Sequence, residues 1–229
     1  MRNIVHIPHS STVIPSEFLP DYVITPELLQ VEANIMCDKG TDLLVDLDDN
    51  VVIFPYSRIF CDVERYNSYL EEMNSVGMGI LYENSHDLIH IRKVKNPELI
   101  LKYYHEHHSK LNILTKKILD ESGEVLIIDL HSYSDIPLKY ELHKGLKRPD
   151  ICIGINNFHM DDKLKYEILY IIDKFGFSYE INQPFIGSLI PSDFINDSRV
   201  KGVMIEIKKS IMEAEFQKIR EVIKCIKKI

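Results

Sequence analysis

Short, continuous apolar runs recur along the chain and alternate with longer periodic segments. The runs cover residues 3–7, 51–55, 125–130, 151–155 and 203–207. Runs of this length without an alternating polar face are typical of strands that are covered on both sides. They predict a central sheet with helices packed on its two faces.

Two of the intervening segments begin with helix-start signals. In Thr25-Pro26-Glu27 an N-cap threonine precedes a first-turn proline and an acidic side chain, and Asn96-Pro97-Glu98 repeats this order. The first signal predicts a helix that reaches about Leu47. The second predicts a long helix that ends near Gly123.

Two further helices are predicted nearer the C-terminus. Residues 161–174 are periodic and stop before Gly176, which suits the position just after a helix. Ser210 and Glu213 have the spacing of a capping box at the start of another helix. Strands that alternate with helices predict an α/β fold, with one three-layer domain over residues 1–229 and a mixed, largely parallel central sheet.

Charge and cysteine content narrow the class of partner and the compartment. The formal net charge is -8, and no basic stripe is present, which argues against nucleic acid or an anionic membrane as a partner. The 4 cysteines are scattered without a C-x-x-C pair, as expected in a reducing compartment. The N-terminus lacks a signal-peptide pattern, and no apolar run has the length of a membrane span. We therefore expect a cytoplasmic protein.

Polar side chains stand at or near the ends of three predicted strands. His9 follows the first apolar run, Asp129 and His131 stand at the end of the third, and Glu206 lies inside the last. Ligand sites in open α/β sheets gather at the carboxyl ends of strands. Two histidines and one carboxylate would make a catalytic zinc site with one open position. Asp129 would then accept the second ring N–H of a ligating histidine, or line the site itself.

Each of these residues also has a purely structural interpretation. A histidine after a strand is more often a hydrogen-bonded structural residue than a ligand. Glu206 would be costly in a core strand unless it is functional or forms a buried ion pair with Lys208 or Lys209. The histidines at positions 105, 107 and 108 cannot share one face of their predicted helix, so at most one of them should reach the core.

Arg58 and Arg65 flank a short apolar segment and are candidates for holding a substrate carboxylate. Guanidinium groups bind planar carboxylates through paired hydrogen bonds. The structural alternative is a salt bridge from either arginine to Asp62 or Glu64.

Taken together and in this order, the motifs of the chain resemble those of the N-formylglutamate amidohydrolase family. The resemblance covers nearly the whole chain. The matching segments are Ile7-Pro8-His9-Ser10-Ser11, Asp38-Lys39-Gly40-Thr41-Asp42-Leu43-Leu44, Ser57-Arg58, Asp62-Val63-Glu64-Arg65, Asp129-Leu130-His131-Ser132, Asn182-Gln183-Pro184-Phe185-Ile186-Gly187 and Ile205-Glu206-Ile207. That family is similar in fold to zinc exopeptidases of the carboxypeptidase type.

The resemblance implies metal-assisted hydrolysis of an amide bond. The implied ligands of one divalent metal ion, expected to be zinc, are His9, Asp38 and His131. Glu206 resembles the catalytic carboxylate of the zinc peptidases. The implied contacts to substrate are Arg58, Arg65 and Asn182. The substrate would be a small carboxylate-bearing N-acyl amino acid such as N-formylglutamate.

The chain departs from the family pattern at positions expected to face the substrate. Glu64 replaces an asparagine, Lys208-Lys209 replaces Asn-Arg, and Ser11 replaces a glycine. These changes leave open a related zinc amidase or carboxypeptidase-like enzyme that acts on another acyl amino acid or a peptide. A catalytically silent binding protein of the same fold is the other alternative.

Overall fold

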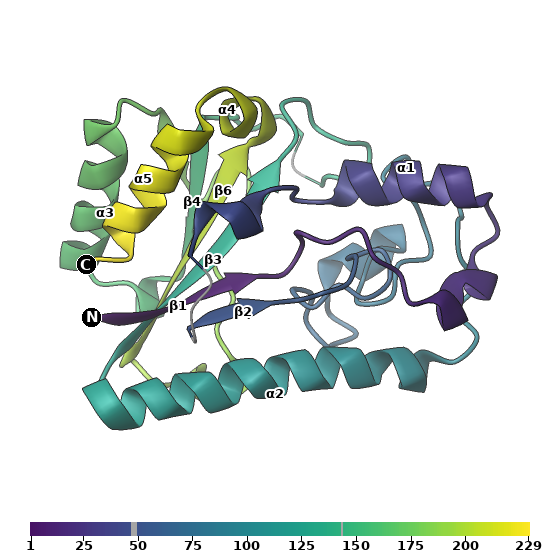
Figure 1. Cartoon of the computed structure of the whole chain (residues 1–229), viewed down its shortest axis with the longest axis horizontal. Coiled ribbons are helices and arrows are strands. Elements are labelled where there is room, and N and C mark those ends of the chain that lie inside the picture. The colour runs from purple at the N-terminus through teal and green to yellow at the C-terminus, as the bar shows by residue number, and fades with distance from the viewer. Residues whose placement is uncertain (47–49, 143) are drawn as a thin grey trace.

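A mixed sheet forms the centre of the molecule (Figure 1). The computed structural model describes residues 1–46, 50–142 and 144–229. Within these residues the strands are β1 (Arg2–Ile7), β2 (Val51–Ile53), β3 (Val125–Tyr133), β4 (Ile151–Ile155), β5 (Tyr179–Ile181) and β6 (Val200–Lys208). Their order is β2-β1-β3-β6-β4-β5, and all neighbours are parallel except β4 and β6. The largely parallel sheet that the sequence predicts is confirmed.

The helices of the described residues are α1 (Pro26–Met36), α2 (Pro97–Ser122), α3 (Asp162–Lys174), α4 (Lys209–Ala214) and α5 (Phe216–Ile226). Helices cover both faces of the sheet, whereas α1 lies beyond its strands (Figure 1) and packs against the segment that contains Ile59 and Tyr82. The long helix α2 runs along one face, and α3 and α5 pack on the other (Figure 1). Consecutive residues of β3 face opposite layers, since Ile127 packs with Leu111 of α2 and Ile128 packs in the cluster that contains Ile223 of α5. The three-layer α/β arrangement follows from this burial on both faces.

Strand β5 was not predicted from the sequence because it contains no continuous apolar run. Its three residues are Tyr-Glu-Ile, and each is only half-buried at the edge of the sheet. The predicted strand near residues 125–130 is longer than expected and continues to Tyr133. His131 therefore lies within a strand, where it is paired with Glu206 of β6.

The first helix ends at Met36 and does not continue to Leu47, which itself lies outside the described residues. The chain leaves the helix because the backbone N–H of Asp38 donates to the carbonyl of His9 at 2.8 Å. Gly40 then adopts a left-handed φ of 88°, which favours glycine, before the short 3-10 turn Thr41–Leu44. The early ending delivers Asp38 to the edge of the sheet.

The predicted capping box near the C-terminus is also wrong. Ser210 lies inside the first turn of α4, and its hydroxyl donates to the Asp135 carboxylate instead of capping the helix. The helical segment is broken at Glu215, after which α5 begins. The predicted helix at residues 161–174 is confirmed, with Gly176 just beyond it at a φ of 73°.

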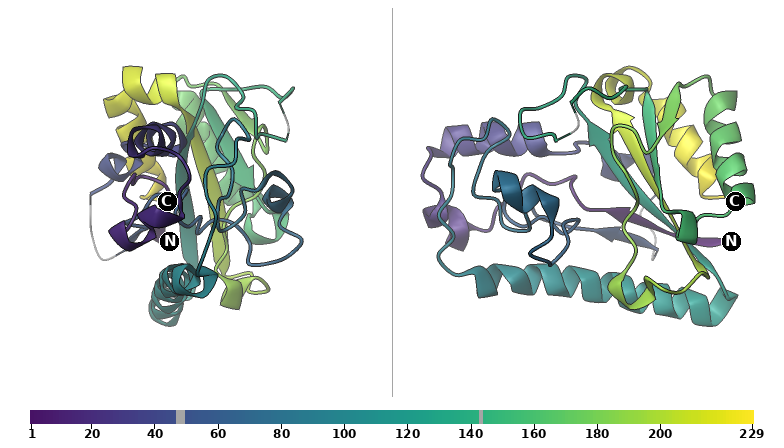
Figure 2. Two further views of the ribbon diagram at one scale, coloured as in Figure 1. Left: turned by 90° about the vertical axis from the view of Figure 1, so that its right-hand side faces the viewer. Right: turned by 180° about the vertical axis from the view of Figure 1, so that it is seen from behind.

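A long irregular segment between β2 and α2 extends the fold away from both termini (Figures 1 and 2). It lies between α1 and α2 and includes the 3-10 turn Glu72–Val76. The fully buried Arg92 holds it in place, donating to the carbonyl oxygens of Phe60 at 2.8 Å and Ile59 at 3.3 Å. These bonds fix the turn that carries Arg58 and Asp62 toward the sheet. Among the described residues, no helix combines the length and apolar character needed to cross a membrane.

Candidate active site

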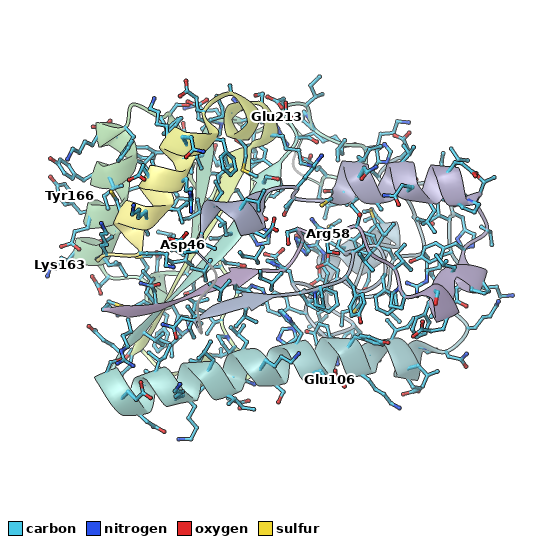
Figure 3. All side chains as sticks on the ribbon, in the orientation of Figure 1. Asp46, Arg58, Glu106, Lys163, Tyr166 and Glu213 are labelled. Carbon is cyan, nitrogen blue, oxygen red and sulfur yellow. The ribbon has the colours of Figure 1, made fainter. Side chains whose placement is uncertain are left out.

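Polar side chains from separate segments converge beyond the carboxyl ends of β1, β3 and β6, the edge where parallel sheets place their sites. His9 follows β1, whereas His131 and Glu206 lie on adjacent strands and are paired in register. The irregular segment adds Arg58 and Asp62. Arg58 lies beyond the ends of β1 and β2 (Figure 3).

The imidazoles of His9 and His131 lie side by side, with ring centroids 5.1 Å apart. Each is buried, and each has one ring nitrogen next to a carboxylate: His9 Nε2 is 2.8 Å from Asp62 Oδ1, and His131 Nδ1 is 3.2 Å from Asp38 Oδ2. The remaining nitrogens, His9 Nδ1 and His131 Nε2, form no well-aligned hydrogen bond but face carboxylates: Asp38 Oδ2 lies 3.5 Å from His9 Nδ1, and Asp129 Oδ1 lies 3.0 Å from His131 Nε2. Histidines that bind metals are typically oriented by a carboxylate on the other nitrogen in this way.

Two carboxylates face this pair of rings. His9, Glu64 and His131 each offer one ligand atom, and these atoms lie within 4.8 Å of one another, so the group could hold a metal ion. Glu64 approaches His131 Nε2 to 3.1 Å and His9 Nδ1 to 3.8 Å. Asp38 Oδ2 is 3.5 Å from His9 Nδ1 as well as 3.2 Å from His131 Nδ1. Two imidazoles with unpartnered nitrogens and adjacent carboxylates form a donor set that suits a divalent transition metal.

The electrostatics of this cluster are dominated by its buried carboxylates. Burial opposes a charge on His131, yet the carboxylates of Glu64 and Asp129 raise its pKa well above the usual range. Burial likewise opposes ionisation of Asp38, but the neighbouring imidazoles of His131 and His9 hold its pKa below the usual range. The cluster therefore stabilises positive charge between its acidic groups.

Glu206 stands apart from these pairs. It is only 8% exposed, and its Oε2 has no hydrogen-bond partner. Burial raises the pKa of its carboxyl to about 8. The expected structural alternative, an ion pair with a neighbouring lysine, is absent among the described residues, because Lys208 pairs with Asp150 and Lys209 donates to the carbonyl of Ile35.

A cavity of about 430 Å³ opens beside these groups and is lined by Asp38, Glu64 and Glu206. Arg58 and Arg65 line it too, and both also contact Asp62: Arg58 Nη2 donates to Asp62 Oδ2 at 2.9 Å, and Arg65 Nε lies 3.4 Å from the same oxygen. The salt bridges considered from the sequence thus exist while both arginines still face the cavity.

Asn182 does not line this cavity. Its side-chain oxygen accepts hydrogen bonds from the backbone N–H groups of Ile155 and Gly187, and its amide nitrogen donates to the carbonyl of Ile155. Asn182 therefore anchors the turn whose Pro184 and Phe185 form part of the cavity wall. Any effect of this residue on substrate would pass through that turn.

A buried polar network behind the rings was not foreseen from the sequence. His6 Nδ1 lies 2.7 Å from Asp129 Oδ1, and His6 Nε2 lies 2.8 Å from His107 Nε2. Asp129 Oδ1 is also 3.0 Å from His131 Nε2, the nitrogen that faces Glu64, whereas Asp38 contacts the other ring nitrogen. The expected role of Asp129 as acceptor of the second ring N–H of a metal ligand stays a prediction. The available signal was that His6 and Asp129 are both polar residues in apolar strands, and they prove to be register partners.

Comparison with known proteins bears on the fold and the family. The sequence profile of the family described as N-formylglutamate amidohydrolase matches residues 1–212. The solved structure of an N-formylglutamate amidohydrolase from Ralstonia eutropha JMP134 is similar, with a TM-score of 0.78 and 18% identity over 99% of this chain and 91% of that chain. The gene product Atu2144 from Agrobacterium tumefaciens is similar with a TM-score of 0.69 and 16% identity, over 98% and 87% of the two chains.

A search of curated proteins gives no match. At the identities found, the two solved structures show a shared fold, which agrees with the layered sheet described above. The family profile extends over most of the chain and includes the segments that carry both histidines and Glu206. The chain belongs to the N-formylglutamate amidohydrolase family.

Proposed function

We propose that this protein is a metal-dependent amidohydrolase that cleaves the amide bond of a small, carboxylate-bearing N-acyl amino acid. One observation carries the proposal: His9 Nδ1 and His131 Nε2 point at a group of carboxylates without forming a well-aligned hydrogen bond, in the same cluster as a buried Glu206 whose Oε2 is unpartnered. Buried polar atoms are rarely left without partners unless a ligand or a reaction uses them. Membership of the amidohydrolase family supports the same reaction type.

His9 and His131 would hold one divalent ion, for which zinc is the expected identity, together with a carboxylate. Asp38 is the third ligand that the family resemblance suggests, and it faces both rings. Glu64 is the carboxylate that the unpartnered nitrogens favour, because it approaches both of those atoms. When bound, such an ion polarises a carbonyl oxygen and lowers the pKa of a water molecule.

Glu206 is the residue proposed to move the proton. Its Oε2 is free to accept a proton from the attacking water and to return it to the nitrogen of the leaving amine. Because burial raises the pKa of this carboxyl to about 8, the group can take up and release a proton near neutral pH.

Arg58 and Arg65, which line the cavity, would bind the carboxylate of the substrate. The two guanidinium groups share one carboxylate, that of Asp62. One of their two positive charges is therefore left to bind the carboxylate of a substrate. Arg65 suits this role best, because its Nε has no hydrogen-bond partner and its side chain is 19% exposed. N-formylglutamate is the substrate that the family name suggests, whereas Glu64 and Lys209 in the cavity wall favour testing other acyl amino acids and peptides as well.

The test combines metal content with turnover. Protein purified without chelator should hold about one zinc per chain by mass spectrometry, and His131→Ala should lose it. Glu206→Gln should keep the metal and lose at least about a hundredfold in turnover. Normal turnover in metal-loaded Glu206→Gln would refute the assigned role, and absence of metal after zinc addition would favour a silent binding protein.

The third ligand is separable by two matched variants. Asp38→Asn and Glu64→Gln each remove one negative charge while keeping the shape of the side chain. Loss of a carboxylate that only hydrogen-bonds to a ligand typically lowers metal affinity by about 10–100-fold. The variant whose zinc affinity falls more therefore identifies the carboxylate that binds the metal itself. Competition with a chromogenic chelator gives both affinities on one scale.

A further inference from the structure

A second cavity of about 320 Å³ adjoins the one described above. Both are lined by the same five residues, Glu64, Arg65, Glu72, Ile186 and Met204. The two cavities are therefore contiguous, and the candidate metal ligand Glu64 lies at their junction. A substrate whose reacting carbonyl sits at this junction can extend in both directions.

The position of Glu206 sets the direction of the substrate, provided that the proposed function holds. Glu206 lines the first cavity and not the second, and it is the group that protonates the leaving amine. The amino-acid half must then occupy the first cavity, where Arg58 and Lys209 add positive charge for its carboxylate. The acyl half is left with the second cavity, which we call the acyl cavity.

The walls of the acyl cavity combine apolar and charged side chains. Tyr66, Leu70 and Leu189 supply apolar surface, in addition to the shared Ile186 and Met204. The acidic residue Glu71 at this cavity already accepts hydrogen bonds from the backbone N–H groups of Tyr66 and Met73.

Glu64 and the exposed Glu72 line the same space together with Arg65, so the acidic side chains of this cavity outnumber the basic one and would repel an acyl group that carries its own carboxylate. A formyl group, with a single carbon, would leave the apolar side chains of this cavity in contact with water.

We propose that the preferred substrates are N-acyl amino acids whose acyl group is an uncharged chain of several carbons, bound in the cavity formed by Tyr66, Leu70 and Leu189. Burial of each added methylene in an apolar site contributes a gain of up to about fourfold in kcat/KM. The gain should continue until the chain fills the cavity.

The test uses the zinc-loaded full chain and the N-formyl, N-acetyl, N-butanoyl and N-hexanoyl derivatives of glutamate. We expect kcat/KM to rise along this series and N-succinyl glutamate to be poor. Leu70→Ala, at a side chain that is 74% exposed and so tolerant of truncation, should reduce the ratio of hexanoyl to acetyl turnover. Ile113→Ala is the matched control, because Ile113 is 67% exposed on α2 and lines neither cavity.

The outcomes separate this inference from the proposed function. Hydrolysis that is fastest for the formyl compound, or independent of chain length, would overturn the acyl cavity while leaving the amidohydrolase reaction intact. If no compound is hydrolysed, the affinity of Glu206→Gln for the same series can be measured by calorimetry. Affinity that rises with the length of the acyl chain supports the acyl cavity without any turnover. Affinity that is flat along the series overturns it.

Discussion

Replacing Asp62 by asparagine should destabilise the protein by about 3–5 kcal/mol, although no atom is lost from the core. Asp62 is fully buried and its carboxylate contacts both Arg58 and Arg65. It also accepts a hydrogen bond from the Tyr82 hydroxyl at 2.7 Å and lies 2.8 Å from His9 Nε2. The substitution leaves two mostly buried guanidinium groups, on side chains that are 11% and 19% exposed, without their shared anion, which is the costly way to break an ion pair.

The measurement is urea unfolding of wild type and Asp62→Asn, both in chelator so that metal binding does not contribute to the difference. Asp120→Asn is the matched control. Asp120 makes an ion pair with Lys116 at 2.8 Å, but the two side chains are 68% and 65% exposed, so its loss should cost about 0.5 kcal/mol or less. A loss below about 1 kcal/mol for Asp62→Asn would show that the arginines find other partners, and would refute the reasoning.

Two further predictions concern stability. Burial lowers the pKa of His108 from 6.5 to about 4. Between these pH values the imidazole is protonated in the unfolded chain and neutral in the folded protein. The free energy of unfolding should therefore fall by up to about 3 kcal/mol as the pH drops through this window. His108→Gln should flatten that part of the pH dependence, and an unchanged slope would contradict the assignment. In Gly154→Ala the added Cβ would lie 2.0 Å from the Gly187 carbonyl oxygen, so we expect a loss of about 1–3 kcal/mol or more and a disturbed cavity wall. Gly145→Ala, where nothing lies within 4 Å, is the control for thermal unfolding, and equal midpoints for the two variants would argue against the clash.

Much of the layered fold could be predicted because its strands are apolar on both faces. The runs that became β1, β3 and β6 are visible from composition alone, and they carry or adjoin His9, His131 and Glu206. Parallel pairing of these strands then brings their polar ends together. Periodicity failed at α1, where a single backbone hydrogen bond from Asp38 to His9 ends the helix. A tertiary contact of this kind leaves no local pattern in the sequence.

The residues that complete the site were harder to foresee for the same reason. Glu64 was visible as a possible partner of the arginines and as a departure from a family pattern, and nothing in its neighbourhood indicates that it faces His131. The pairing of His6 with Asp129 depends on the register of two strands that are separated by 123 positions. Contacts between residues this far apart in the sequence depend on the order and register of the strands. Local sequence patterns do not determine either.

The distribution of partners within the site argues that its one unpaired carboxylate is kept for chemistry. Buried carboxylates are costly unless charge or hydrogen bonds compensate them. Asp62 is compensated by two arginines, and Asp129 by His6 and His131. The arginines belong to the same segment as Asp62, whereas His6 of β1 reaches Asp129 from a neighbouring strand. Among the buried carboxylates that the structure describes, only Glu206 retains an unpartnered oxygen, and it lines the cavity in register with His131. Because the fold compensates the acids around it, this exception supports the proposal that Glu206 transfers a proton to substrate.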